Sequence, residues 1–159
     1  MYKTLLAILV CLTVVRLVPR ATAQAGDIAV IVNPDNSSTN VSLADLRKLF
    51  AGEKRTWPGS GTPIRLFVRA PGSHERTVLL QLLGMSETEY KQHWTAQIFR
   101  GDADSEPMAI ASFGIALEAV RTFRGAICFV EARDIRPGIS LKVIKVDGRM
   151  PGDPGYPLH

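Results

Sequence analysis

The sequence has little cysteine, and this scarcity narrows the chemistry that the chain can support. Its two cysteines are Cys11 and Cys128. Cys11 lies in an N-terminal leader that we expect to be removed, so Cys128 has no intramolecular disulfide partner. Cys128 stands in an apolar segment and has no histidine near it in the sequence. A buried thiol is therefore expected, and not a nucleophile or a metal ligand.

Catalytic and metal-binding spacings are also missing. The histidines His74, His93 and His159 do not have the spacing of a metal site. Ser60 lies between two glycines, which is typical of a turn and not of the strand-to-helix elbow that presents a nucleophilic serine. Because no nucleophile is spaced with a base, the sequence predicts a non-enzymatic protein with no cofactor and no metal, and an enzyme ranks third among three functional hypotheses.

A strong charge of one sign is missing once the leader is set aside. The whole chain has 19 basic and 15 acidic residues. The first 23 residues contain three basic residues and no acidic one, which leaves 16 basic and 15 acidic residues. No block of like charge remains, and the tryptophans and phenylalanines are expected in the core. These features argue against a nucleic-acid partner and against a polybasic membrane patch.

The N-terminal apolar run is too short for a membrane span. It covers residues 5–15, well below the roughly 20 residues that cross a bilayer. Ala21-Thr22-Ala23 then supplies the small-x-small pattern that signal peptidase recognises. We therefore predict a secretory signal peptide over 1–23, a periplasmic or secreted protein, and no stable membrane anchor. Two arginines between the apolar run and this pattern leave open a cut after Ala25.

The remaining chain alternates short apolar segments with amphipathic ones. This alternation predicts an α/β fold, a single three-layer domain over residues 24–148 with a mostly parallel sheet. A proline-rich tail over 149–159 is predicted to be disordered. Strands are expected over 28–32, 63–68, 126–130 and 139–146, and helices over 43–50, 73–83, 86–101 and 107–123.

One strand-to-helix turn has the layout of an anion site. Arg69 would end a strand, Gly72 would permit a tight turn, and Ser73 would open a helix. The N-terminus of a helix offers free N–H groups and the positive end of the helix dipole, which favour a phosphate or a carboxylate. The alternative is that Ser73 only caps the helix while Arg69 faces solvent or pairs with an acid. Local spacing leaves both readings open.

Four segments, which follow one another along the chain in the same order as in the family, resemble the substrate-binding proteins of phosphate ABC transporters. They are a helix with the pattern Leu-Phe-x-Gly before Trp57, the strand-turn-helix over 63–83, the segment 90–101, and Gly-Ala-Ile-Cys-Phe-Val over 125–130. The resemblance is to one lobe of this two-lobed, type II periplasmic binding-protein fold. It implies a single-lobe short form, since the chain has no room for a second lobe.

The resemblance implies a set of anion-binding residues. The phosphate loop of that family reads Arg-Ser-Asp-Gly-Ser-Gly-Thr, and Arg69, Gly72 and Ser73 agree with it. Arg76, in the first helical turn, is added as a candidate that could replace lost contacts. The chain departs from the family pattern at Ala70, Pro71, His74 and Glu75. An acid replaces a hydroxyl that would contact the anion, so weak capture is expected.

Two further hypotheses follow from this resemblance. The first is an exported solute-binding-like protein that binds inorganic phosphate or a similar oxyanion weakly, and that acts in uptake or sensing with a transporter or sensor partner. The alternative is a periplasmic protein-interaction module that has lost ligand capture and meets a partner or another copy of itself. An exposed apolar patch would favour the second hypothesis.

Overall fold

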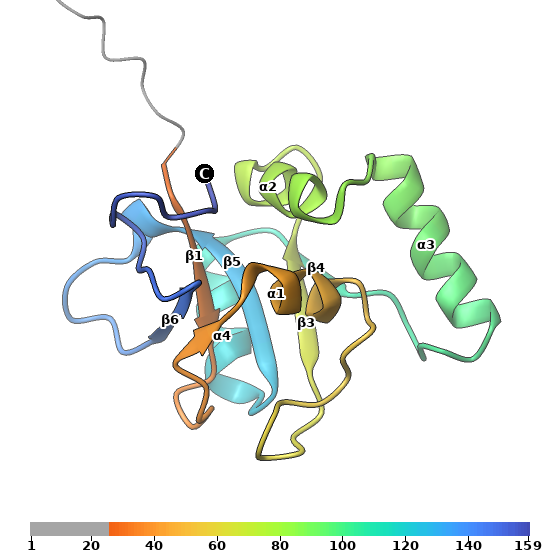
Figure 1. The fold of residues 1–159 in the computed structure, drawn as a ribbon, viewed down its shortest axis with the longest axis horizontal. Coiled ribbons are helices and arrows are strands. Elements are labelled where there is room, and N and C mark those ends of the chain that lie inside the picture. The colour runs from red at the N-terminus through yellow and green to blue at the C-terminus, as the bar shows by residue number, and fades with distance from the viewer. Residues whose placement is uncertain (1–25) are drawn as a thin grey trace, which may run out of the picture.

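The computed structural model describes residues 26–159, so the predicted signal peptide lies outside the described residues. Six strands form one sheet in the order β2-β6-β1-β5-β3-β4. β1 runs antiparallel to both neighbours, whereas the other three pairings are parallel. Five strands therefore share one direction, which confirms the mostly parallel sheet (Figure 1). The strands are β1 Ile28–Val32, β2 Asn40–Val41, β3 Arg65–Arg69, β4 Met108–Ile110, β5 Ala126–Glu131 and β6 Lys142–Val146.

Helices cover both faces of this sheet, as expected for a three-layer α/β domain. β1 is buried along its whole length because alternate side chains enter two separate cores. One core lies under α1, α2 and α3, and the other lies under α4 alone. In Figure 1, α1 and α2 lie in front of the strands and α4 lies behind them. The helices are α1 Leu43–Phe50, α2 His74–Leu83, α3 Glu87–Phe99 and α4 Phe113–Thr122, with a short 3-10 helix η1 Ala132–Asp134.

Serine side chains cap the first three helices, and the predicted cap at Ser73 is confirmed. The side chains of Ser42, Ser73 and Ser86 each accept a hydrogen bond from the backbone N–H three residues later. At α3, the Glu89 carboxylate also accepts from the N–H of Ser86, which forms a capping box. Gly84 ends α2 in the left-handed conformation, with φ 68°, which a residue with a side chain adopts at a cost.

The helix predicted over 107–123 is wrong in its first part. Residues Met108–Ile110 form β4, which pairs with β3 at the edge of the sheet, and α4 begins only after Ser112. Pro107 favours the first turn of a helix, but it is equally compatible with the start of an edge strand, where no N–H is needed on the outer side. The short apolar segment after Pro107 therefore does not distinguish the first turn of a helix from the start of an edge strand.

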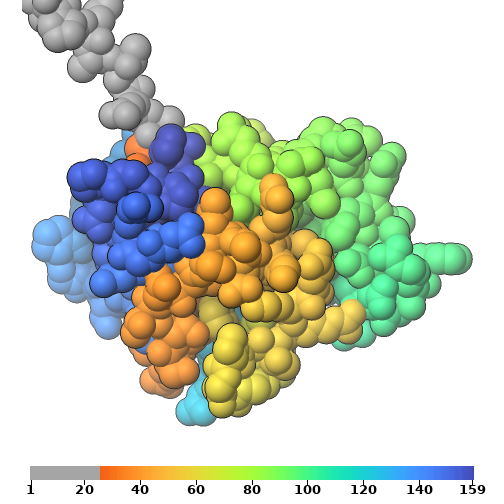
Figure 2. Space-filling view, viewed as in Figure 1, coloured from red at the N-terminus to blue at the C-terminus, as the bar shows by residue number. Residues whose placement is uncertain are grey.

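The prediction of a disordered tail over 149–159 is also corrected. Tyr156 and Leu158 are buried against the core under α1 and α2. The carbonyl of Leu158 accepts a hydrogen bond from the N–H of Ile28, and the hydroxyl of Tyr156 donates to the carbonyl of Ile28. Figure 2 shows these last residues, in dark blue, covering the same side of the molecule as α1 and α2. The tail is rich in proline, but the buried side chains of Tyr156 and Leu158 fix it against the core.

Residues 26–159 contain neither a membrane-spanning helix nor a metal-binding cluster. None of the helices in this part of the chain is long and apolar enough to cross a membrane. The same residues contain no cluster of three or more His, Cys, Asp or Glu side chains with the geometry of a metal site.

Candidate functional site

The predicted turn lies at the carboxyl end of β3 and opens α2. Gly72 has φ 89°, a left-handed conformation that glycine adopts readily. Ser73 follows in extended conformation and accepts from the N–H of Arg76 at 3.1 Å, so it caps α2. The remaining N–H groups of the first turn of α2 therefore point beyond the end of the sheet. Ligands of open α/β sheets bind in this position.

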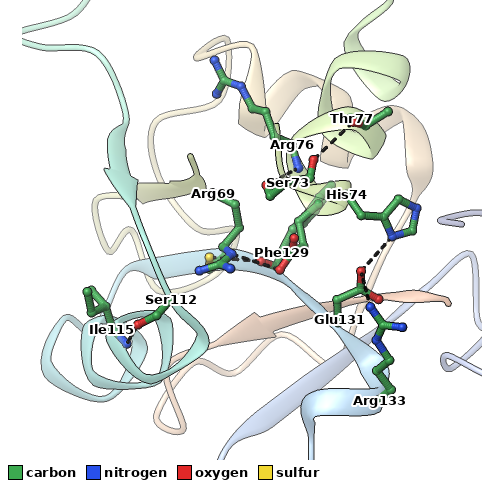
Figure 3. Close-up of polar contacts among 12 residues, drawn as sticks. Arg69, Ser73, His74, Arg76, Thr77, Ser112, Ile115, Phe129, Glu131 and Arg133 are labelled. Atoms are coloured by element: carbon green, nitrogen blue, oxygen red, sulfur yellow. Dashed lines mark hydrogen bonds and ion pairs between the residues drawn. The ribbon is translucent and has the colours of Figure 1, made fainter. Parts of the chain in front are cut away.

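A second helix begins beside the first. β4 pairs with β3 in parallel, with Arg69 opposite Ile110. Two residues later Ser112 caps α4, and its side chain accepts from the N–H of Ile115 at 3.3 Å. Figure 3 shows Arg69 between these two helix starts, with Ser73 on one side and Ser112 on the other. The dipoles of both helices thus add positive potential at this edge.

The guanidinium of Arg69 is neutralised from within the chain. Its Nε donates to Oε1 of Glu75 at 2.9 Å, and the two side chains are only 14% and 6% exposed. Nη1 of Arg69 is buried and has no hydrogen-bond partner among the described residues. Arg69 thus offers one donor for a further acceptor, while a carboxylate already occupies its Nε. The sequence analysis gave an acid partner for Arg69 as one alternative, and Glu75 is that partner.

A second carboxylate lies at the same edge. Glu131 ends β5 and is 6% exposed. Its Oε1 lies 2.9 Å from Nδ1 of His74, the first residue of α2, and 3.5 Å from Nη2 of Arg133 (Figure 3). Glu75 and Glu131 together oppose an incoming anion, which limits what the helix dipoles and Arg69 can attract.

Arg76 is not brought to this edge. Its Nε and Nη2 donate to the two carboxylate oxygens of Glu87 at 3.1 and 2.5 Å, and its guanidinium lies 3.9 Å from the ring centroid of Tyr90. Burial opposes the charge of Arg76, but the bond and the charge of Glu87 raise its pKa overall. The same pair lowers the pKa of Glu87. Arg76 therefore joins α2 to α3.

Cys128 behaves as the sequence predicts. It is fully buried within β5, and desolvation raises its pKa to about 12. A thiol that keeps its proton at neutral pH is a poor nucleophile.

Sequence reasoning found the turn and identified Glu75 as an acid in it, but it did not assign Glu75 as the partner of Arg69, and it missed Glu131. Glu75 and Glu131 are 6 and 62 residues from Arg69 along the chain. The helical position of Glu75 offered a hint, because an acid in the first turn of a helix can face back towards the preceding strand. Nothing in the local sequence indicates the contact between His74 and Glu131, since it joins two distant segments.

A mixed α/β lobe with a strand-turn-helix loop at the carboxyl edge of its sheet defines the class: it has the fold of one lobe of a periplasmic binding protein. The chain belongs to the family of the PBP superfamily domain, whose model matches residues 22–149. No curated protein sequence matches the chain.

Solved structures with the same fold are proteins of phosphate transport. A phosphate transport receptor from Vibrio cholerae superposes with a TM-score of 0.62 at 20% identity, covering 79% of this chain and 48% of that protein. A putative phosphate ABC transporter substrate-binding protein from Clostridium perfringens, solved with phosphate, gives 0.61 at 19%, covering 77% and 46%. PstS from Borrelia burgdorferi gives 0.60 at 17%, covering 79% and 49%. The chain thus spans less than half the length of each, which corresponds to one lobe.

Proposed function

We propose that this chain is an exported, non-enzymatic, single-lobe solute-binding protein that binds inorganic phosphate or a similar oxyanion weakly, in uptake or sensing. The observation that carries the proposal is the loop from Arg69 to Ser73, which joins the largely buried side chain of Arg69 to the N-terminus of α2. The structural relatives that transport phosphate support the choice of oxyanion. A transporter or sensor partner belongs to the same proposal.

Weak binding follows from the charges at the loop. An anion that approaches the first turn of α2 meets Glu75, which already holds Arg69 at 2.9 Å, and Glu131 lies on the same edge. A lone lobe also leaves the anion in contact with water, where salt screens its attraction to the protein. The geometry therefore supports a dissociation constant far above that of an enclosed site.

The proposal is tested by titrating phosphate and sulfate into the mature protein by calorimetry, at constant ionic strength. A second measurement follows the melting temperature, because a ligand at 100 times its dissociation constant adds about 2.7 kcal/mol to the stability. The informative variant is Glu75→Gln, which keeps an amide beside Arg69 but removes the repelling charge. We expect it to bind phosphate about tenfold more tightly, or ~1.4 kcal/mol.

The matched control is Glu87→Gln. It removes the same charge from the partner of Arg76, away from the loop, and should leave phosphate affinity unchanged. If neither the wild type nor Glu75→Gln responds to any oxyanion, the binding proposal is wrong. If both variants gain equally, the effect is one of net charge and not of the loop.

A second candidate function is self-association, which the apolar surface near β4 favours. Met108 and Ile115 are 61% and 49% exposed, and Phe99 at the end of α3 is 92% exposed. β4 is the last strand of the sheet, so its outer edge has unpaired backbone groups. A groove of about 570 Å³ along α3, which includes Phe99, lies away from Arg69.

Light scattering across a range of protein concentrations tests this second candidate. A dimer that Met108→Lys converts to a monomer would support pairing through β4, whereas a monomer at all concentrations would rule it out. The phosphate titration tests a different feature, because Met108 lies opposite Phe67 and not opposite Arg69.

A further inference from the structure

Glu131 has one carboxylate oxygen without a hydrogen-bond partner among the described residues. Oε1 is engaged by His74 and Arg133, but Oε2 is buried and unpaired. A buried carboxylate oxygen with no donor costs free energy, so a native structure usually supplies one. The missing donor is therefore to be sought on the residue that lies beside Oε2.

That residue is Gly26, at the start of the described chain. A Cβ atom placed on Gly26 would lie 3.3 Å from Oε2 of Glu131. The antiparallel register explains this proximity, because Ile28 pairs with Glu131 and the carbonyl of Asp27 accepts from the N–H of Ala132. Gly26 is thus held beside the carboxylate by the same ladder that joins β1 to β5.

The sequence places a second signal-peptidase pattern directly before this glycine. Ala23-Gln24-Ala25 has small residues at the first and third positions, as does 21–23. Cleavage after Ala25 would turn the nitrogen of Gly26 into an α-ammonium group. One-third of a turn about the Cα–C bond moves that nitrogen to the Cβ position, and so to ion-pair distance of Oε2. In a chain that begins at Gly26, no preceding residue opposes this rotation, and the nitrogen is charged.

We propose that the exported chain is cut after Ala25 and that the new α-amino group of Gly26 forms a buried ion pair with Glu131. The proposal rests on the export included in the proposed function, but it does not require anion binding. Processing would then complete the hydrogen bonding of Glu131 and anchor the start of β1. A cut after Ala23 would leave an uncharged amide at Gly26.

The charged surroundings define where this pair responds to pH. α-Amino groups ordinarily lose their proton near about pH 8, and histidines near about pH 6.5. Between about pH 7 and pH 10 the amine is thus the group expected to change charge, while carboxylates and arginines keep theirs. The titratable and charged groups around it are His74 on α2, Arg133 after β5, Asp27 beside it, and Tyr156 and the terminal carboxylate of His159 in the tail.

The first test uses the full chain, expressed with its own leader in a bacterium that has a periplasm. The intact mass of the exported protein should correspond to a chain that begins at Gly26. A mass that begins at Gln24, or one that retains the leader, would overturn the proposal.

The second test compares two chains released from a fusion that leaves no added residue, one beginning at Gly26 and one at Ala25. At about pH 7 the Gly26 chain should melt about 2–5 °C higher. The difference should vanish at about pH 10 and when both chains carry Glu131→Gln, whereas Glu118→Gln on the exposed face of α4 should preserve it. Equal melting temperatures, or a difference that survives Glu131→Gln, would contradict the ion pair. Phosphate binding is measured separately on both chains, so its failure leaves this result intact.

Discussion

Arg69 and Arg76 lie on either side of the serine that caps α2, and their side chains are only 14% and 7% exposed, yet they serve different parts of the molecule. Arg69 pairs with Glu75, whose side chain is 6% exposed, at the carboxyl edge of the sheet. Arg76 pairs with Glu87, whose side chain is 47% exposed, and lies over Tyr90. One pair sits at the proposed binding edge, and the other fixes α3 to the body.

The two ion pairs differ in the exposure of the carboxylate that would remain if the arginine were removed. Removal of a buried ion partner is costly when the remaining charge cannot reach water, and modest when it can. Glu75 cannot reach water without a change in α2, whereas Glu87 can. At Glu75, where the chain departs from the loop sequence that the resemblance implies, the acid therefore forms a contact that supports the fold.

The largest expected effect is that of Arg69→Ala. It leaves the Glu75 carboxylate buried without its partner, and breaking such a pair costs about 3–5 kcal/mol. The dipole of α2 compensates part of this cost, so we expect about 3 kcal/mol in urea unfolding. Arg76→Ala, the matched control, should cost about 1–2 kcal/mol, mainly through lost packing over Tyr90.

An equal cost for the two variants would contradict this distinction between the pairs. The double variant Arg69→Met with Glu75→Gln checks the cause, since it removes both charges and should recover most of the stability lost by Arg69→Ala. If it does not recover, the cost of Arg69→Ala comes from packing and not from the stranded carboxylate.

A smaller effect is expected from the caps that open α2 and α3. Ser73→Ala and Ser86→Ala each remove one side-chain acceptor from a helix start, at about 1 kcal/mol each. Their costs in urea unfolding should be similar. Only Ser73→Ala should also reduce the phosphate response, because Ser86 opens a helix far from the loop. A loss of response in both variants would place the anion elsewhere.

Local signals predicted the parts of this fold that local chemistry decides. A short apolar run predicted β1, and Ser73 predicted where α2 begins, because both depend on neighbouring residues alone. The three-residue β4 and the packed tail escaped prediction, since each is stabilised by partners far along the chain. Pairing of Met108–Ile110 with β3, and of Leu158 with Ile28, decides those two segments.

In the candidate site, too, local sequence predicted the residues of one turn but not the contacts with distant residues. Arg69, Gly72 and Ser73 were predicted together because one turn connects them, and the structure brings them together. Arg76 belonged to the same turn in sequence, but its partner Glu87 is 11 residues away and directs it to α3. The contribution of an arginine depends on which acid it reaches, and that choice is made by the tertiary structure.

The smallest expected effect is the acid dependence of the Arg76–Glu87 pair. The hydrogen bond from Arg76, followed by its charge, lowers the pKa of Glu87 below its ordinary 4.5. A carboxylate with a lowered pKa in the folded state stabilises the protein above its ordinary pKa, and the contribution is lost as the pH falls through the lowered value. Because Glu87 is half exposed, we expect less than about 1 kcal/mol.

In urea unfolding between about pH 6 and pH 3, the stability difference between wild type and Glu87→Gln should therefore shrink as the pH falls below about 4.5. A difference that stays constant over this range would mean that the carboxylate of Glu87 stabilises α3 through its shape and not through its charge.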